Sequence, residues 1–345
     1  MQLSTFQVVP ITNRAGVLEW INNTIPLKMM IEDQMGQGKE VGRSRATVAM
    51  RKFLHNLDSE ATIHEQHIIA LGLKRQEIVD NYSNVVSKFP KYLLREGFKS
   101  KCSTPEIFLI RRANFIKSYA SFCIGSYILG IGDRHLENFL ISLNSGCIYG
   151  IDFGIAFDSG VHLGVPELAP FRLTPQILEL IEPYSLKGHM RHALYALRRN
   201  QNLILDTCEI FVREPLLEWV KEAQNQNFSS EEQNESLRKH KKQLDNKEKI
   251  EWYPQQKIDR MKDKLEGKNS AKVMMKELSA SPHCHKDYFT QIKAALVGPK
   301  DGYRYKVLKQ KKRCLEVEEQ VDFLIEHASD PDILGRLWIG WSPYV

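Results

Sequence analysis

The chain has 345 residues, of which 42% are hydrophobic and 26% charged, a composition typical of folded globular proteins rather than of disordered ones. No run approaches the roughly 20 apolar residues that span a bilayer, so the sequence predicts no membrane segment. The six cysteines form no C-x-x-C pair, which argues against a structural zinc site and against a secreted disulfide framework.

The first 60 residues predict strands followed by a connector. Two strand-like runs, residues 6–11 and 17–21, flank a turn-rich gap that contains Gly16. Residues 31–60 are more polar. The stretch Gly36-Gln37-Gly38-Lys39 has the Gly-Lys pair of a phosphate-binding loop, but it lacks the following Ser or Thr and a preceding buried strand. We therefore interpret it as a flexible connector.

The middle of the chain predicts a mostly helical α+β fold with one short β-hairpin. A broad apolar surface after Pro105 predicts a long buried helix that ends at the glycines of residues 130–132. Residues 139–143 and 147–152 predict two strands joined by a tight turn at residues 144–146. Such a hairpin brings Asn138, just before it, close to Asp152, at its far end.

Residues 221–275 are highly charged, with a basic run centred on residues 238–242. A basic run can bind nucleic acid. Acidic residues are interleaved with it, however, which favours a solvated helix face or a disordered loop. Beyond residue 276 the apolar periodicity returns, and the chain finishes in an aromatic-rich tail.

Four polar residues around the predicted hairpin fit phosphoryl transfer from ATP. This chemistry needs a carboxylate that orients the attacking hydroxyl and hard oxygen ligands for magnesium. Asp133 supplies the first group, Asn138 and Asp152 supply the ligands, and His135 lies beside them. The alternative is that these residues merely cap a turn and begin and end strands. Agreement of several short motifs across one hairpin favours the catalytic interpretation.

These motifs resemble the phosphatidylinositol 3-kinase-related protein kinase family. The catalytic loop of the family resembles Gly130-Ile131-Gly132-Asp133-Arg134-His135-Leu136-Glu137-Asn138, its metal motif resembles Ile151-Asp152-Phe153-Gly154, and the end of its activation loop resembles residues 165–174. The tail from about residue 318 resembles its FATC segment. The resemblance implies the large C-terminal lobe of a protein-kinase-like fold of the PI3/PI4-kinase type, with remnant small-lobe strands.

The resemblance also implies domain limits and site roles. Residues 1–30 would be the end of the small lobe and the hinge, 31–220 the large lobe, 221–312 a charged insert with connecting helices, and 313–345 the FATC segment. Asp133 would be the catalytic base, and His135 would stabilise charge on the transferred phosphoryl group. Asn138 and Asp152 would bind Mg²⁺ or Mn²⁺. The residues that would line the adenine site of ATP are Trp20, Ile21, Leu140 and Ile151.

The implied activity is serine/threonine protein kinase activity, with Ser or Thr followed by Gln as the expected substrate site. The family branch that it resembles most is nuclear and repairs DNA double-strand breaks by non-homologous end joining. That branch works with the Ku heterodimer and DNA ends, through regions outside this chain. The family's phosphate-covering loop and phosphate-pairing Lys would precede residue 1, so we expect a truncated chain with weak activity alone.

Two alternatives stay open at the level of sequence. A lipid kinase would share the residues around Asp133 and Asp152, but an anionic head group needs a basic loop. Residues 155–173 contain Arg172 as their single Lys or Arg. A non-catalytic regulatory or scaffold fragment is the second alternative.

Overall fold

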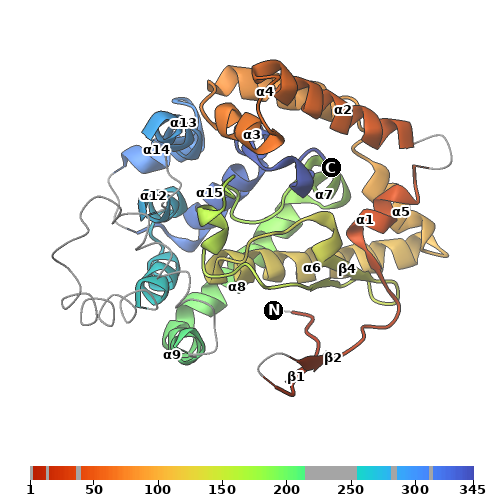
Figure 1. Cartoon of the computed structure of the whole chain (residues 1–345). Coiled ribbons are helices and arrows are strands. Elements are labelled where there is room, and N and C mark those ends of the chain that lie inside the picture. The colour runs from red at the N-terminus through yellow and green to blue at the C-terminus, as the bar shows by residue number, and fades with distance from the viewer. Residues whose placement is uncertain (1–2, 13–14, 36–39, 214–254, 281–285, 311–313) are drawn as a thin grey trace.

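The computed structural model describes residues 3–12, 15–35, 40–213, 255–280, 286–310 and 314–345 (Figure 1). The predicted connector at residues 36–39 and the basic run at residues 238–242 lie outside them. The described fold is mostly helical with few strands, as the sequence predicts. None of the described helices is both long and apolar enough to cross a membrane.

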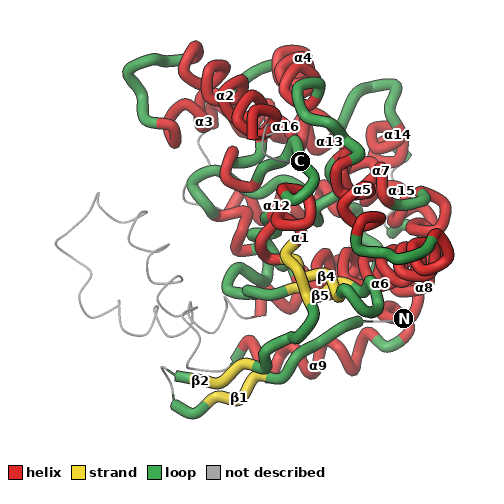
Figure 2. The backbone as a smooth tube through the Cα atoms, turned by 90° about the vertical axis from the view of Figure 1, so that its right-hand side faces the viewer, coloured by secondary structure: helices red, strands yellow, loops and turns green. Residues whose placement is uncertain are grey.

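An exposed hairpin near the N-terminus matches the two strands predicted there. Strand β1, Val8–Pro10, pairs antiparallel with β2, Gly16–Leu18. All six strand residues are exposed. Figure 2 shows this hairpin set apart from the second, more central sheet. The apolar side chains of β1 and β2 therefore contribute little to the core.

The second sheet carries the predicted hairpin. Strands β3 (Thr24–Pro26), β4 (Phe139–Ser142) and β5 (Ile148–Gly150) are antiparallel neighbours in that order. Phe139 and Ile141 are buried, whereas Leu140 between them is partly exposed, which is the alternation expected of a strand with one face on the core. The hairpin prediction is confirmed.

Helix α6, Pro105–Leu129, is the long helix predicted after Pro105, and it is largely buried from Phe115 onward. The expectation of burial is wrong for its first turns, where Leu109 and Ile110 are 58% and 62% exposed. The Thr104 side chain accepts a hydrogen bond from the Ile107 N–H, and Pro105 stands at the first helical position, which suits a residue without an N–H. Gly130 ends the helix with a φ of 60°, a left-handed conformation that glycine adopts without strain. Helix α8, Pro183–Arg199, packs along α6.

The remaining helices cover this centre. Figure 1 shows α2, α3 and α4 at the top, α1 and α5 at the right beside the sheet, and α12, α13 and α14 at the left. Their bounds are α1 Leu27–Glu32, α2 Glu40–Leu57, α3 Ile63–Leu71, α4 Arg75–Val86, α5 Leu93–Ser100, α7 Pro175–Leu180, α9 Gln201–Val212, α12 Ser270–Ala280, α13 Lys286–Val297, α14 Tyr303–Lys309, α15 Val317–Ser329 and α16 Pro331–Arg336. Residues 255–265 are also helical. Three short 3₁₀ turns complete the fold: η1 Leu136–Asn138, η2 Ser159–His162 and η3 Ile339–Trp341.

The second half of the charged stretch is folded, so the expectation of a solvated or disordered segment is wrong for residues 255–275. Lys257, Asp263 and Lys264 are all buried. Lys257 and Arg260 pair with Glu277 of α12, and Lys264 donates to both carboxylate oxygens of Asp158 at 2.7 Å. The interleaved charges did not indicate a solvated segment here, because they form ion pairs with side chains of other elements instead of facing water.

Buried ion pairs join the C-terminal helices to the helical layer of α3 and α4. The fully buried guanidinium of Arg304 pairs with Asp330, which Arg75 also contacts at 2.9 Å. Arg336 pairs with Asp332 at 2.9 Å and donates to the Leu71 carbonyl at 2.7 Å. Burying a charge is tolerated only when it is paired in this way.

Asp330→Asn tests the weight of this network. Asn keeps the size of the side chain but removes the nearer of the two carboxylates that pair with the buried Arg304, leaving only Glu326 at 3.6 Å, so we expect a loss of up to about 3–5 kcal/mol in the free energy of unfolding. The matched control is Asp322→Asn, whose half-exposed pair with Lys187 is expected to contribute less than about 1 kcal/mol. Urea unfolding followed by circular dichroism measures both, and equal losses in the two variants would contradict the assignment.

Candidate active site

The loop after α6 is fastened by main-chain hydrogen bonds to the segment that follows β5. The Gly132 N–H donates to the Ile155 carbonyl at 2.9 Å, and the Phe157 N–H donates to the Leu129 carbonyl at 2.8 Å. The Asp158 N–H donates to the Gly130 carbonyl at 2.9 Å. The two predicted motifs, residues 130–138 and 151–154, thus belong to one rigid arrangement.

Arg134 lies at the centre of that arrangement. Its side chain is almost completely buried, and it donates to the carbonyls of Gly132, Ile151 and Asp152. Burial lowers the pKa of Arg134, an effect that the nearby acids oppose. The guanidinium also lies 5.4 Å from the ring centre of Phe153, in the range of a cation–π contact. Sequence reasoning gave this residue no role, although it ties the catalytic loop to the metal motif.

Asn138 and Asp152 meet at the base of the hairpin, as predicted. The Ile151 N–H donates to the Asn138 carbonyl at 3.1 Å, which sets the two motifs side by side. Asn138 is buried and donates through Nδ2 to the Asp133 carbonyl at 2.8 Å, which leaves its Oδ1 as the candidate ligand atom. Asp152 is exposed, and its Oδ1 accepts from the Gly154 N–H at 3.2 Å.

This donor set fits a magnesium ion that shares its coordination with phosphates. Within the described ranges no three His, Cys, Asp or Glu side chains cluster as a self-contained metal site. Mg²⁺ in kinases commonly takes one or two protein oxygens and completes its shell with water and substrate phosphates. An amide oxygen from Asn138 and a carboxylate oxygen from Asp152 would hold it, and the ion would neutralise charge on the phosphates.

Asp133 and Asp152 both have left-handed backbone conformations, with φ of 52° and 56°. For a residue with a Cβ this conformation costs about 1–2 kcal/mol, so the surroundings must fix it. Around Asp133, the N–H donates to both carboxylate oxygens of Glu167, at 2.8 and 2.9 Å. Sequence reasoning missed Glu167, whose one visible signal was its place in the activation-loop segment.

His135 stands next to Asp133 and partly faces solvent. Its Nε2 is 3.8 Å from the Asp133 Oδ2, and its Nδ1 accepts from the Glu137 N–H at 3.2 Å. The structure therefore brings His135 and Asp133 together, with the Nε2 edge of the imidazole toward the carboxylate.

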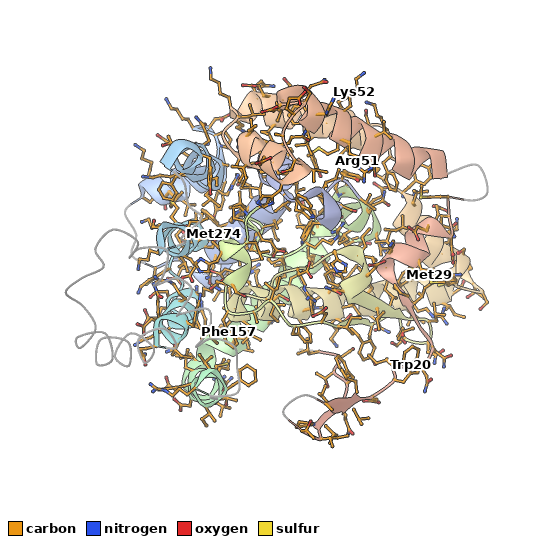
Figure 3. All side chains as sticks on the ribbon, in the orientation of Figure 1. Trp20, Met29, Arg51, Lys52, Phe157 and Met274 are labelled. Atoms are coloured by element: carbon orange, nitrogen blue, oxygen red, sulfur yellow. The ribbon has the colours of Figure 1, made fainter. Side chains whose placement is uncertain are left out.

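The predicted adenine contacts divide into two groups. Leu140 and Ile151 are partly exposed on the hairpin face opposite the core, where strand alternation also places Tyr149. Ile21 is partly exposed, and its carbonyl accepts from the Thr24 hydroxyl at the start of β3. Trp20 is 85% exposed, on the segment leading from β2 to β3 (Figure 3). The adenine role of these four residues stays a prediction.

The C-terminal tail forms one wall of the site. Arg172, fully buried, donates to the main-chain oxygens of Trp341, Ser342 and Val345 at 2.6–2.7 Å. Burial lowers the pKa of Arg172 to about 10, which still leaves it charged at neutral pH. A cleft of about 370 Å³ lies between the catalytic loop and this tail, lined among others by Asp133, His135, Glu167, Trp338 and Trp341.

Comparison with known proteins shows the family of the chain. Residues 1–221 match the family described as phosphatidylinositol 3- and 4-kinase, and residues 314–345 match the FATC domain. The chain belongs to the phosphatidylinositol 3- and 4-kinase family and carries a FATC domain.

The chain is also similar to individual proteins over nearly its whole length. It is 37% identical to the DNA-dependent protein kinase catalytic subunits of Dictyostelium discoideum and Mus musculus, over 99% and 100% of this chain. It is 25% identical over its whole length to the serine-protein kinase ATM of Sus scrofa. The chain spans about 8% of the length of the first two relatives and 10% of the third. The solved FAT and kinase domain of CtTel1 shares the fold, with a TM-score of 0.59 and 21% identity over 99% of this chain and 19% of that one.

A pH-dependent contribution to stability is expected from Glu167. Burial raises the pKa of Glu167 to about 7, and the Asp133 charge adds to this although the Asp133 N–H bond opposes it. Because the folded state holds the proton more tightly than the unfolded chain, the stabilisation is complete below about pH 4.5 and is lost as the pH rises through about 7.

Comparison with Glu167→Gln isolates this effect, since Gln does not titrate. Between pH 5 and pH 8 the stability of the wild type should fall relative to that of the variant by on the order of 2 kcal/mol. Urea midpoints at several pH values measure the difference. A constant difference across this pH range would refute the raised pKa.

Proposed function

We propose that the chain provides the catalytic loop and the metal site of a protein kinase that transfers the γ-phosphoryl group of ATP to serine or threonine. The supporting observation is the Arg134 guanidinium, which binds carbonyls of both motifs and so holds Asp133 next to Asn138 and Asp152. Phosphoryl transfer depends mainly on positioning and on electrostatic stabilisation, and a rigid cluster of this kind suits both.

Each residue has a distinct proposed role. Asp133 accepts a hydrogen bond from the substrate hydroxyl and orients its oxygen for attack on the γ-phosphorus, taking the proton as the new bond forms. His135, beside it, donates through Nε2 to a phosphoryl oxygen as charge builds there. Asn138 and Asp152 hold the divalent ion, Mg²⁺ or Mn²⁺. The faces of Leu140 and Ile151, with Ile21 and Trp20, receive the adenine.

A protein substrate is favoured over a phosphoinositide. A highly anionic head group requires free cations beside the catalytic loop. Arg172, the single Lys or Arg in residues 155–173, is fully buried and occupied by carbonyls of the tail. His162 is bound to Glu277 at 2.9 Å. This segment therefore offers an anionic lipid little attraction.

The relatives suggest a cellular setting for this activity. They include DNA-dependent protein kinase catalytic subunits and ATM. We infer from this likeness a nuclear kinase of the DNA damage response, acting in double-strand break repair by non-homologous end joining at Ser or Thr followed by Gln. The Ku heterodimer and DNA ends would bind regions of the full-length protein outside this chain.

Nucleotide binding separates a kinase from a non-catalytic scaffold. Titration of the chain with a non-hydrolysable ATP analogue should show binding that requires Mg²⁺ and weakens on addition of EDTA. Transfer assays on the full-length protein then compare a Ser-Gln peptide with phosphoinositide vesicles, and peptide labelling is expected. Absence of nucleotide binding would support the scaffold alternative, and labelling of the vesicles alone would support the lipid kinase.

Substitution of the site acids tests the individual roles. Asp133→Ala should lower peptide phosphorylation at least about 100-fold while Mg²⁺-dependent nucleotide binding persists, because the metal ligands stay in place. Asp152→Asn should instead weaken that binding about tenfold or more. Asp206→Asn, an exposed carboxylate on α9, is the control for both. Retained turnover in Asp133→Ala, with the control unchanged, would overturn the assignment of the base.

A further inference from the structure

Glu167 makes a contact that links three segments of the chain. Its carboxylate accepts the Asp133 N–H through both oxygens, and its own N–H donates to the Gly160 carbonyl at 3.0 Å. Asp133 belongs to the catalytic loop, Gly160 to the turn η2, and Glu167 to the stretch that leads to Arg172. Glu167 therefore connects the segment after the metal motif, through its main-chain N–H, to the proposed base, through its carboxylate.

Two glycines leave space for this carboxylate on the side away from the cleft. A Cβ on Gly132 would lie 2.5 Å from the Glu167 Oε2, and a Cβ on Gly160 would lie 2.8 Å from the same oxygen. The neighbours of Glu167 in sequence, Pro166 and Leu168, are buried. Gly132 and Gly160 therefore leave space for the Glu167 carboxylate, and the buried residues before and after Glu167 fix its backbone. Together they hold the carboxylate beneath the catalytic loop.

The other contacts of Asp133 come from within the two motifs. Its carbonyl accepts from Asn138 at 2.8 Å, and the next residue, Arg134, binds carbonyls of residues 132, 151 and 152. The N–H of Asp133 is the group that Glu167 holds from outside. The left-handed backbone at Asp133 sets the direction of its Cα–Cβ bond. Because the hydrogen bond on the Asp133 N–H holds that backbone conformation, the direction of the carboxylate depends on this bond.

We propose that Glu167 is a positioning residue for phosphoryl transfer, which sets the direction of the Asp133 carboxylate by holding the Asp133 N–H. This role rests on the proposed kinase function. It makes the order of residues 154–168 a condition for a correctly aimed base, while Asn138 and Asp152 keep the contacts that the hairpin and Arg134 provide. Loss of Glu167 should therefore affect the chemical step and not nucleotide binding.

Three variants, all made in the full-length protein and assayed at one pH, test the role. Glu167→Ala removes the acceptor and should lower kcat for peptide phosphorylation about 10- to 100-fold, with KM for ATP within about twofold of the wild type. Glu167→Gln keeps one carbonyl oxygen for the Asp133 N–H and should restore most of the rate. Glu182→Ala, an exposed carboxylate on the residue before α8, is the matched control. A merely structural role would not produce this split between kcat and KM together with rescue by Gln.

Amide hydrogen exchange provides a second measurement that does not depend on turnover. Exchange in peptides covering residues 130–136 should accelerate in Glu167→Ala and remain near the wild-type rate in Glu167→Gln and Glu182→Ala. Unchanged exchange in Glu167→Ala would overturn the proposed contact, whatever the activity. Full kcat in Glu167→Ala beside an active wild type would overturn the role alone. A wild type that neither binds nucleotide nor transfers phosphate would overturn the proposed function, and the role of Glu167 with it.

Discussion

The buried guanidinium of Arg134 is the constraint on which the site depends. An Arg side chain in the interior needs acceptors for its fixed fork of donors. Here the acceptors are main-chain carbonyls of the catalytic loop and of the segment that ends the hairpin. Satisfying one charge therefore forces two loops, separated by the whole hairpin, into a single geometry. The hydrogen bonds of Arg134 therefore also fix the relative positions of the side chains on those loops.

Much of this could be predicted from local sequence patterns. The long helix ending at Gly130, the hairpin at residues 139–152 and the pairing of residues 8–10 with 16–18 depend on apolar periodicity and on turn chemistry, which act over short distances. The proximity of Asn138 and Asp152 followed directly from the hairpin. For the same reason the candidate ligands were found without any knowledge of tertiary packing.

What could not be predicted depends on contacts between distant elements. Lys264 belongs to a stretch with the charge pattern of a solvated helix, yet it is buried against Asp158, more than a hundred residues earlier. Glu167 lacked any local sign of its bond to the Asp133 N–H. The positions of such charged residues depend on partners in distant elements. The order of positive and negative residues along the sequence does not indicate which partner each one binds.

Arg172 recognises the C-terminal tail through main-chain oxygens of Trp341, Ser342 and Val345. Every amino acid presents the same carbonyl group, so this attachment is blind to the side chains at Ser342 and Val345. Other contacts constrain those side chains, because Val345 is buried in the core and Ser342 has a left-handed backbone with a φ of 51°. A one-residue insertion or deletion would shift these main-chain oxygens out of register with the guanidinium, so the attachment fixes the spacing of the tail in addition to its buried side chains.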